Sequence, residues 1–250
     1  ASLLPPVSAG GEPPDTNYDE SKVPPYTLPD PLVCFDGRAV ADAAMWRATR
    51  RTEIIEAFAR EVYGRTPTIN TRLRGEALAP EAEIFDGLAT RQQVRIRLFE
   101  SEDAPWIDLL LFVPKETTGP APVFLGLNYG NQGVHPDPGI VASRNSVCRR
   151  GEHARRWPIE WLLKRGYAVA TFHGGDLELD RHGSGCQFTI EGWQKGIRAF
   201  VLRRSGRTEL ADDDWGSIGA WAWGLSRALD YLETDAAVDA RRVVVFGHSR

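Results

Sequence analysis

The segment with the clearest capacity for chemistry is RRVVVFGHSR, residues 241–250. A run of apolar residues leads into Gly247, His248 and Ser249, which is the first half of a nucleophile elbow. In that motif a sharp turn lifts the serine hydroxyl above the edge of a sheet, where it can attack an ester or amide carbonyl. Gly-X-Ser also occurs in ordinary turns, so the alternative interpretation of Ser249 is a turn serine.

Arg250 follows the candidate nucleophile directly. A guanidinium beside Ser249 would stabilise an anionic tetrahedral intermediate and could help to hold a substrate that bears a carboxylate. The alternative is a surface arginine at a helix start, but cations are disfavoured at helix N-termini. We therefore predict that Ser249 is the nucleophile and that Arg250 stabilises the oxyanion.

Two further stretches follow predicted strands and could line the same site. The polar loop NYGNQG, 128–133, contains Asn128, Gly130 and Asn131 and is suited to offering backbone donors. His173 follows the next strand, and we expect a structural or substrate-contact role for it rather than that of a general base.

A histidine and several carboxylates form a second group after His173. His182 with Asp176, Glu178 and Asp180 resembles a metal motif only loosely, because fixed helical spacing is lacking. We interpret the group as an active-site wall or a solvated loop, and we predict no metal and no cofactor.

The elements that must position these residues can be predicted from periodicity. Apolar runs predict strands, and amphipathic spacing with Gly64 and Gly166 as end signals predicts helices. The expected strands are 92–100, 107–114, 121–128, 167–172 and 241–246, and the expected helices are 42–62, 157–166 and 212–235. Helices between continuous apolar strands indicate an α/β fold with a mainly parallel sheet.

Domain organisation can be predicted from composition and from the lengths of the connections. Residues 1–32 contain eight prolines and predict an extended arm that packs on the domain. Residues 33–250 are expected to be the N-terminal part of a single catalytic domain. The long connections 128–156 and 173–211 are expected to build the ligand crevice at the carboxyl ends of the strands.

Composition limits the possible partners. The 250 residues carry a net charge of −4 with 26% charged residues, which does not suit nucleic-acid binding. The apolar runs are too short to cross a membrane. Cys34, Cys148 and Cys186 have no metal-type spacing. We therefore expect neither nucleic acid nor a membrane as a partner.

The sequence also resembles a known protein family. GHSR after VVVF is similar to the start of the Gly-X-Ser-Arg-X-Gly-Lys motif of glucuronoyl esterases, the fifteenth carbohydrate esterase family. The stretches at 17–32, 124–133 and 215–235 resemble bacterial members, so the resemblance covers almost the whole chain. It implies an α/β-hydrolase fold and a serine esterase without metal or cofactor. The implied substrate is the ester between (4-O-methyl-)glucuronic acid of glucuronoxylan and lignin alcohols. It also implies a protein that is secreted or periplasmic, and we expect a monomer.

The elbow motif supplies only the serine of a catalytic triad, which also needs an acid and a histidine. In α/β-hydrolases the acid and the histidine follow the serine, whereas all five histidines here precede or adjoin Ser249. We therefore expect the triad acid and histidine beyond residue 250, in a polypeptide of about 400 residues by family resemblance. The alternatives are another carbohydrate esterase, such as an acetyl-xylan or feruloyl esterase, and a non-catalytic binding protein with the same fold.

Overall fold

The computed structural model describes residues 17–179 and 195–248. The chain divides into two compact units, Ala1–Ile55 and Glu56–Arg250. Five residues singled out above, Asp180, His182, Cys186, Ser249 and Arg250, lie outside the described residues. The predicted packing of the arm 1–32 on the rest of the protein stays a prediction.

The first unit is organised around a helical segment. It contains η1 (Glu20–Lys22), α1 (Ala43–Met45), η2 (Trp46–Arg50) and the start of α2 (Arg51–Phe58). Asp42 caps α1 by accepting a hydrogen bond of 2.8 Å from the Met45 amide. The buried Arg50 donates to the carbonyl oxygen of Pro31 (3.0 Å) and to Glu53 (3.1 Å), which ties the proline-rich segment to the helix within this unit.

The second unit begins in α2, which continues through η3 (Ala59–Tyr63) and ends at Gly64. Gly64 has φ 78°, and a Cβ there would lie 2.2 Å from the carbonyl oxygen of Asp214. Both the conformation and the close approach require glycine. The helix predicted over 42–62, with Gly64 at its end, is confirmed, although two π-helical stretches interrupt it.

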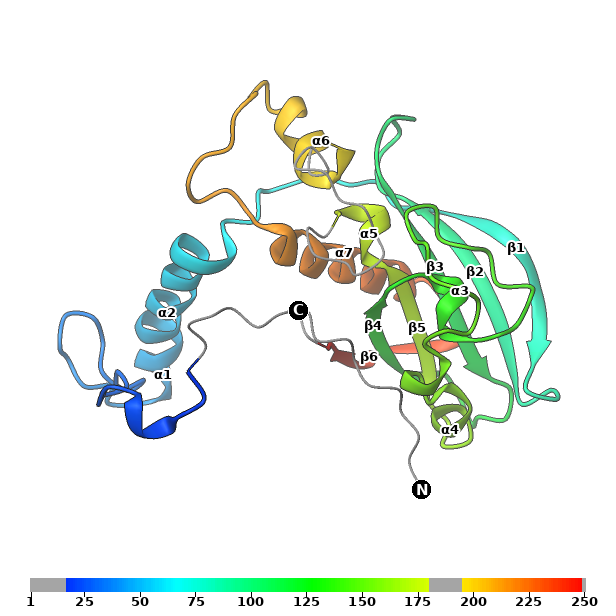
Figure 1. Cartoon of the computed structure of the whole chain (residues 1–250), viewed down its shortest axis with the longest axis horizontal. Coiled ribbons are helices and arrows are strands. Elements are labelled where there is room, and N and C mark those ends of the chain that lie inside the picture. The colour runs from blue at the N-terminus through cyan, green and yellow to red at the C-terminus, as the bar shows by residue number, and fades with distance from the viewer. Residues whose placement is uncertain (1–16, 180–194, 249–250) are drawn as a thin grey trace. The chain divides into compact units, whose positions relative to one another are not determined.

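A six-stranded sheet forms the centre of this unit (Figure 1). The strands are β1 (Arg74–Ile84), β2 (Ala89–Arg97), β3 (Trp106–Pro114), β4 (Ala121–Asn128), β5 (Ala168–His173) and β6 (Val238–Phe246). Their order is β1-β2-β3-β5-β4-β6. The five predicted strands are confirmed as β2 to β6, and β1 is an additional strand at one edge.

The sheet is mixed, which corrects the expectation of a mainly parallel one. Three neighbouring pairs, β1–β2, β2–β3 and β3–β5, are antiparallel, and β4 is parallel to both β5 and β6. The physical reason lies in the connections. Helical crossovers join β4 to β5 and β5 to β6, whereas short turns join β1 to β2 and β2 to β3.

Helices cover both faces of the sheet. The remaining helical elements are α3 (Asn131–Val134), η4 (Ala154–Arg156), α4 (Ile159–Leu163), α5 (Gly174–Leu177), α6 (Ile197–Arg204) and α7 (Ser217–Leu232). Trp223 and Leu232 of α7 join the core on one face, and Ile159 and Leu163 of α4 join the core on the other. The α/β class is therefore confirmed.

The long helix α7 starts later than its sequence pattern predicts. Asp213 and Asp214, expected near the helix N-terminus, instead bind Arg65 (2.6 Å) and Arg207 (2.6 Å). The helix begins at Ser217 with Gly216 as its N-cap. The two carboxylates thus form ion pairs, one of them with an arginine far away in the sequence, instead of lying at the start of the helix.

Residues 17–179 and 195–248 contain neither a candidate membrane span nor a candidate metal cluster. None of the helices described there has the length and apolar character needed to cross a membrane. The same residues contain no cluster of three side chains of the kinds that bind metal ions.

Candidate active site at the carboxyl edge of the sheet

The carboxyl ends of β4, β5 and β6 meet at one edge of the sheet. Asn128 pairs with His173 across β4 and β5, and Gly126 pairs with Phe246 across β4 and β6. Because these strands are parallel, the segments that follow them all start at this edge. The structure therefore brings the predicted loop 128–133, His173 and the start of the elbow, Gly247, to the same side of the sheet.

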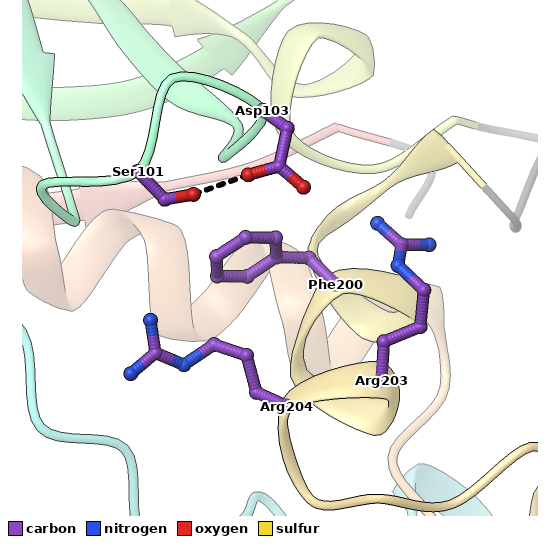
Figure 2. Close-up of a pocket in the computed structure, with 5 residues that line it drawn as sticks. All are labelled: Ser101, Asp103, Phe200, Arg203 and Arg204. Carbon is purple, nitrogen blue, oxygen red and sulfur yellow. Dashed lines mark hydrogen bonds between the residues drawn. The ribbon is translucent and has the colours of Figure 1, made fainter.

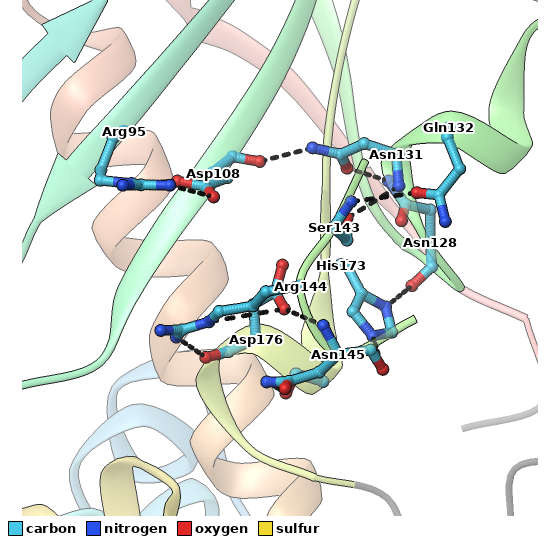
Figure 3. A network of polar contacts seen from close by, with 11 residues as sticks. Arg95, Asp108, Asn128, Asn131, Gln132, Ser143, Arg144, Asn145, His173 and Asp176 are labelled. Atoms are coloured by element: carbon cyan, nitrogen blue, oxygen red, sulfur yellow. Dashed lines mark hydrogen bonds and ion pairs between the residues drawn. The ribbon is translucent and has the colours of Figure 1, made fainter. Parts of the chain in front are cut away.

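Asn128 is the centre of a buried polar network at this edge (Figure 3). Its Nδ2 donates to Thr171 Oγ1 (2.9 Å) and to Asn131 Oδ1 (2.8 Å). Its Oδ1 accepts from the Gly130 amide (2.7 Å). Asn131 in turn donates from Nδ2 to the carbonyl oxygen of Asp108 in β3 (2.8 Å). A single side chain thus connects β4, β5 and the loop, and through Asn131 it connects them to β3.

The loop uses several of its amides to hold its own shape. The amide of Asn131 donates to Ser143 Oγ (2.9 Å), and that of Gly133 donates to the Gly130 carbonyl (2.8 Å). The amide of Gly130 is engaged by Asn128. These three N–H groups are therefore not available to an oxyanion in this conformation. Sequence reasoning identified the loop, but the side-chain contacts assign those residues a supporting role.

His173 lies at the end of β5 and is 7% exposed. Its Nδ1 lies 3.1 Å from the carbonyl oxygen of Asn128, and its Nε2 lies 3.3 Å from that of Asn145. A Cβ on Gly175 would approach Nε2 to 2.5 Å, so glycine there leaves room for the ring. Because both nitrogens face main-chain oxygens, the ring connects two segments and does not point at an open site.

Sequence reasoning missed the role of Asp176 and Arg144 beside this histidine. Asp176 Oδ1 accepts from the Asn145 amide (3.1 Å), and Arg144 donates to the Asp176 carbonyl (2.6 Å). Burial raises the pKa of the Asp176 carboxyl, and the charges of His173 and Arg144 oppose that rise. The Arg144 guanidinium also lies 3.6 Å from the ring centroid of Trp106. The approach of Arg144 to Asp176 brings together residues 32 positions apart, which local patterns do not reveal.

Glu178 is a second buried carboxylate, with no exposed surface. Its Oε2 accepts from the Arg198 amide (3.2 Å), and its Oε1 lies 3.5 Å from Arg198 Nη1. Burial raises the pKa of Glu178 to about 7, and the contacts with Arg198 oppose the rise. Asp176 and Glu178 each face an arginine, so these two members of the loosely metal-like group act in ion pairs in the described part of the chain.

A separate shallow hollow lies between α6 and the β2–β3 connection (Figure 2). It has a volume of about 190 Å³ and is lined by Ser101, Asp103, Phe200, Arg203 and Arg204. None of the predicted site residues lines it. The guanidinium carbon of Arg204 lies 5.7 Å from the centroid of the Phe200 ring, and Ser101 donates a hydrogen bond to Asp103.

Comparison with known proteins gives relatives across nearly the whole chain. No protein-family model matches it. It is 40% identical over 250 residues to Carbohydrate esterase MZ0003 from an unknown prokaryotic organism, covering 94% of this chain and 55% of that protein. Among solved structures it is similar to the glucuronoyl esterase from Solibacter usitatus, with a TM-score of 0.82, 40% identity, and coverage of 92% of this chain and 59% of that one.

A third relative is a promiscuous CE15 esterase from the marine bacterial metagenome. The TM-score is 0.78 and the identity 38%, over 93% of this chain and 59% of that one. The chain thus spans somewhat more than half the length of the relatives that it matches.

Sheet topology and relatives together define a class: the chain has the α/β-hydrolase fold, like the carbohydrate esterases that it resembles. The motifs GHSR and NYGNQG had indicated a resemblance to glucuronoyl esterases, and the comparisons confirm that resemblance. Within the class, the solved structures that the chain resembles at 38–40% identity are a glucuronoyl esterase and an esterase of carbohydrate esterase family 15.

Proposed function

We propose that the protein is a serine carboxylic-ester hydrolase. Its substrate would be the ester between (4-O-methyl-)glucuronic acid of glucuronoxylan and lignin alcohols. The observation that carries this proposal is the 40% identity to a glucuronoyl esterase over 92% of the chain. The register of the sheet supports it, because β6, the strand that precedes GHSR in the sequence, ends at the edge where Asn128 and His173 lie.

The proposed chemistry begins with Ser249. Its Oγ attacks the ester carbonyl of the uronate, and the Ser249 proton passes to a general base. Arg250 stabilises the oxyanion of the tetrahedral intermediate through its amide and its guanidinium. Collapse breaks the bond to the alcohol, which leaves with a proton and gives a glucuronoyl-enzyme. Water then hydrolyses the acyl-enzyme to glucuronate and free Ser249.

In this scheme the general base of the whole protein is a histidine that a carboxylate orients through a hydrogen bond. His173 is not a candidate, because both of its nitrogens contact main-chain carbonyl oxygens. His135 is not a candidate either. Its Nδ1 accepts a hydrogen bond from the Asp137 amide (3.1 Å), and a contact with β2 holds the loop that contains it.

The test uses the full-length natural protein with three substrates: benzyl glucuronate, benzyl galacturonate and acetylated xylan. We expect hydrolysis of benzyl glucuronate in preference to the other two. Release of acetate without cleavage of either uronate ester would overturn the substrate assignment in favour of an acetyl-xylan esterase. Ser249→Ala should abolish turnover and leave the melting temperature unchanged.

We also propose that the protein acts as a monomer outside the cytoplasm, either secreted or in the periplasm. This rests on the implied substrate, which is a cell-wall polymer. Light scattering of the purified protein tests the oligomeric state, and fractionation of the producing cells tests the location.

A further inference from the structure

Tyr129 is the one exposed residue in the buried stretch 128–134 at the end of β4. Its side chain is 44% exposed, whereas Asn128 and every residue from Gly130 to Val134 are buried. An aromatic side chain carries a large apolar surface, and leaving that surface in water forgoes the free energy that burial would give. Single exposed aromatic residues are common on protein surfaces, but this one is held in place from both sides.

The main chain around Tyr129 is fixed. Asn128 Oδ1 accepts a hydrogen bond from the Gly130 amide (2.7 Å), and Ser146 Oγ donates to the carbonyl oxygen of Tyr129. Gly130 has φ 141°, and a Cβ there would lie 2.2 Å from Ser146 Oγ, so the turn requires glycine. A ligand that stacks on the Tyr129 ring would therefore not have to order the loop, which favours binding.

The register of the sheet relates Tyr129 to the elbow segment. Gly126 pairs with Phe246 across the parallel strands β4 and β6. Tyr129 comes three residues after Gly126, and Ser249, the proposed nucleophile, comes three residues after Phe246. Neighbouring strands lie about 4.8 Å apart, so the chain reaches the same edge of the sheet at adjacent positions before these two residues.

One segment contacts both the Tyr129 ring and the last residue of β6. The ring meets the His153 ring edge-on, with the two centroids 5.6 Å apart. From His153 the chain continues through η4 to Trp157, whose ring centroid lies 5.3 Å from that of Phe246. The exposed ring therefore lies among the segments that border the end of β6.

The surface around the ring offers apolar contacts and few hydrogen-bonding groups. Val147, the residue after Ser146, is 68% exposed. The amides of Gly130 and Asn131 are already engaged within the protein. A sugar needs several polar partners for its hydroxyl groups, whereas an aryl group needs an aromatic or aliphatic face. This surface therefore suits an aryl group better than a sugar.

We propose that Tyr129, with Val147 beside it, binds the aryl group of the alcohol in the ester substrate. Tyr129 is then a specificity-determining residue, which contacts the leaving alcohol and neither gives nor takes a proton. An ester whose alcohol has no aryl group gains nothing from this contact. The inference rests on the proposed function and adds to it the residues that select the alcohol.

Two esters that differ only in the alcohol test this role in the full-length natural protein. Benzyl glucuronate and methyl glucuronate share the acid and the bond that is cleaved. We expect Tyr129→Ala to lower kcat/KM for the benzyl ester by about three- to tenfold, and for the methyl ester by less than about twofold. Tyr129→Phe should keep the wild-type ratio, because the ring remains. Val147→Ser should shift the ratio in the same direction as Tyr129→Ala, by a smaller factor.

Trp161→Ala is the matched control. Trp161 is an exposed aromatic residue of α4 and stacks with Arg165, so its loss should leave the ratio of the two esters unchanged. Because the Tyr129 ring is exposed, Tyr129→Ala should keep the melting temperature of the natural protein. Tyr129→Leu, which retains apolar bulk without the aromatic face, replaces it if the alanine variant does not fold.

The pattern of losses decides between the possible roles of Tyr129. An equal loss for both esters would overturn the proposal, because Tyr129 would then act on the acid part of the substrate or on the loop. No loss for either ester would overturn it as well. If the natural protein hydrolyses neither ester, the proposed function fails and the inference fails with it. Normal hydrolysis by the natural protein with an unchanged ratio in Tyr129→Ala rejects the inference alone.

Discussion

Asn128 and Thr171 are joined across two parallel strands by a hydrogen bond of 2.9 Å, from Nδ2 to Oγ1. Both side chains are buried at the carboxyl edge of the sheet. The same amide group reaches Asn131, so one residue fixes the distance between β5 and the loop after β4. A buried polar side chain in this position stabilises the fold only while all its hydrogen-bond partners are present.

Asn128→Ala should therefore destabilise the protein by about 2–4 kcal/mol, because it leaves Thr171 and the Gly130 amide without their partner. Denaturant unfolding measures the loss. Asn70→Ala, at an exposed position, is the control and should have little effect. A loss for Asn128→Ala no greater than that of the control would contradict the network.

Gly126→Ala tests the contact between β4 and the strand that leads into the elbow. A Cβ at Gly126 would lie 2.7 Å from the Phe246 ring, which also packs against Trp157. We expect a loss of about 1–3 kcal/mol in stability from overpacking, measured by denaturant unfolding. Phe246→Leu in the same chain should recover part of the loss.

The matched control for that substitution is Gly119→Ala, since a Cβ at Gly119 meets nothing within 4 Å. It should be nearly neutral. If Phe246→Leu worsens Gly126→Ala and the two losses simply add, the clash with the ring is not the cause.

Glu178 should make stability depend on pH. An unfolded glutamate ionises near pH 4.5, whereas the buried carboxyl keeps its proton up to about pH 7. Between these values the folded state binds more protons, so raising the pH lowers the free energy of unfolding, on the order of 3 kcal/mol in all. The decrease levels off above the folded pKa of about 7.

Melting temperatures of the natural protein and Glu178→Gln, measured across this pH range, test the prediction. The substitution should flatten the pH dependence and raise relative stability at the alkaline end. Glu233→Gln, at an exposed site, should retain the wild-type slope. Parallel curves for the natural protein and Glu178→Gln would show that Glu178 is not the titrating group.

Arg250→Ala should lower kcat for benzyl glucuronate by about 10²–10³ if Arg250 stabilises the oxyanion. The melting temperature should remain close to that of the natural protein. Arg241→Ala, at an exposed position of β6, is the control. Equal kcat values for the two variants would remove Arg250 from the mechanism.

The sequence by itself determined the elements whose side-chain burial is periodic. The continuous apolar runs of β3 and β5 reflect strands buried on both faces, so they were recognisable without any partner. The helices α4 and α7 were likewise visible from their apolar stripes. The motifs GHSR and NYGNQG carried the family resemblance, because a nucleophile elbow and a polar loop are local features of the chain.

Local patterns were insufficient where burial is irregular. Strand β1, with the sequence RGEALAPEAEI, is largely exposed and contains a proline, so it has no apolar alternation to recognise. It becomes a strand by pairing with β2. The antiparallel arrangement of β1, β2 and β3, which makes the sheet mixed, also depends on that pairing.

Only the tertiary structure decided what the site residues do. Sequence reasoning placed Asn128 and His173 at the site because each ends a predicted strand. Their partners, Thr171 and Asn145, lie 43 and 28 residues away. The Asn128–Thr171 hydrogen bond exists because the parallel register of β4 and β5 aligns the strand ends, whereas the His173–Asn145 contact depends on how the connection after β4 packs. Side-chain type and spacing thus identify which residues reach the edge of the sheet, while register and long-range packing determine which of them hold the loops in place.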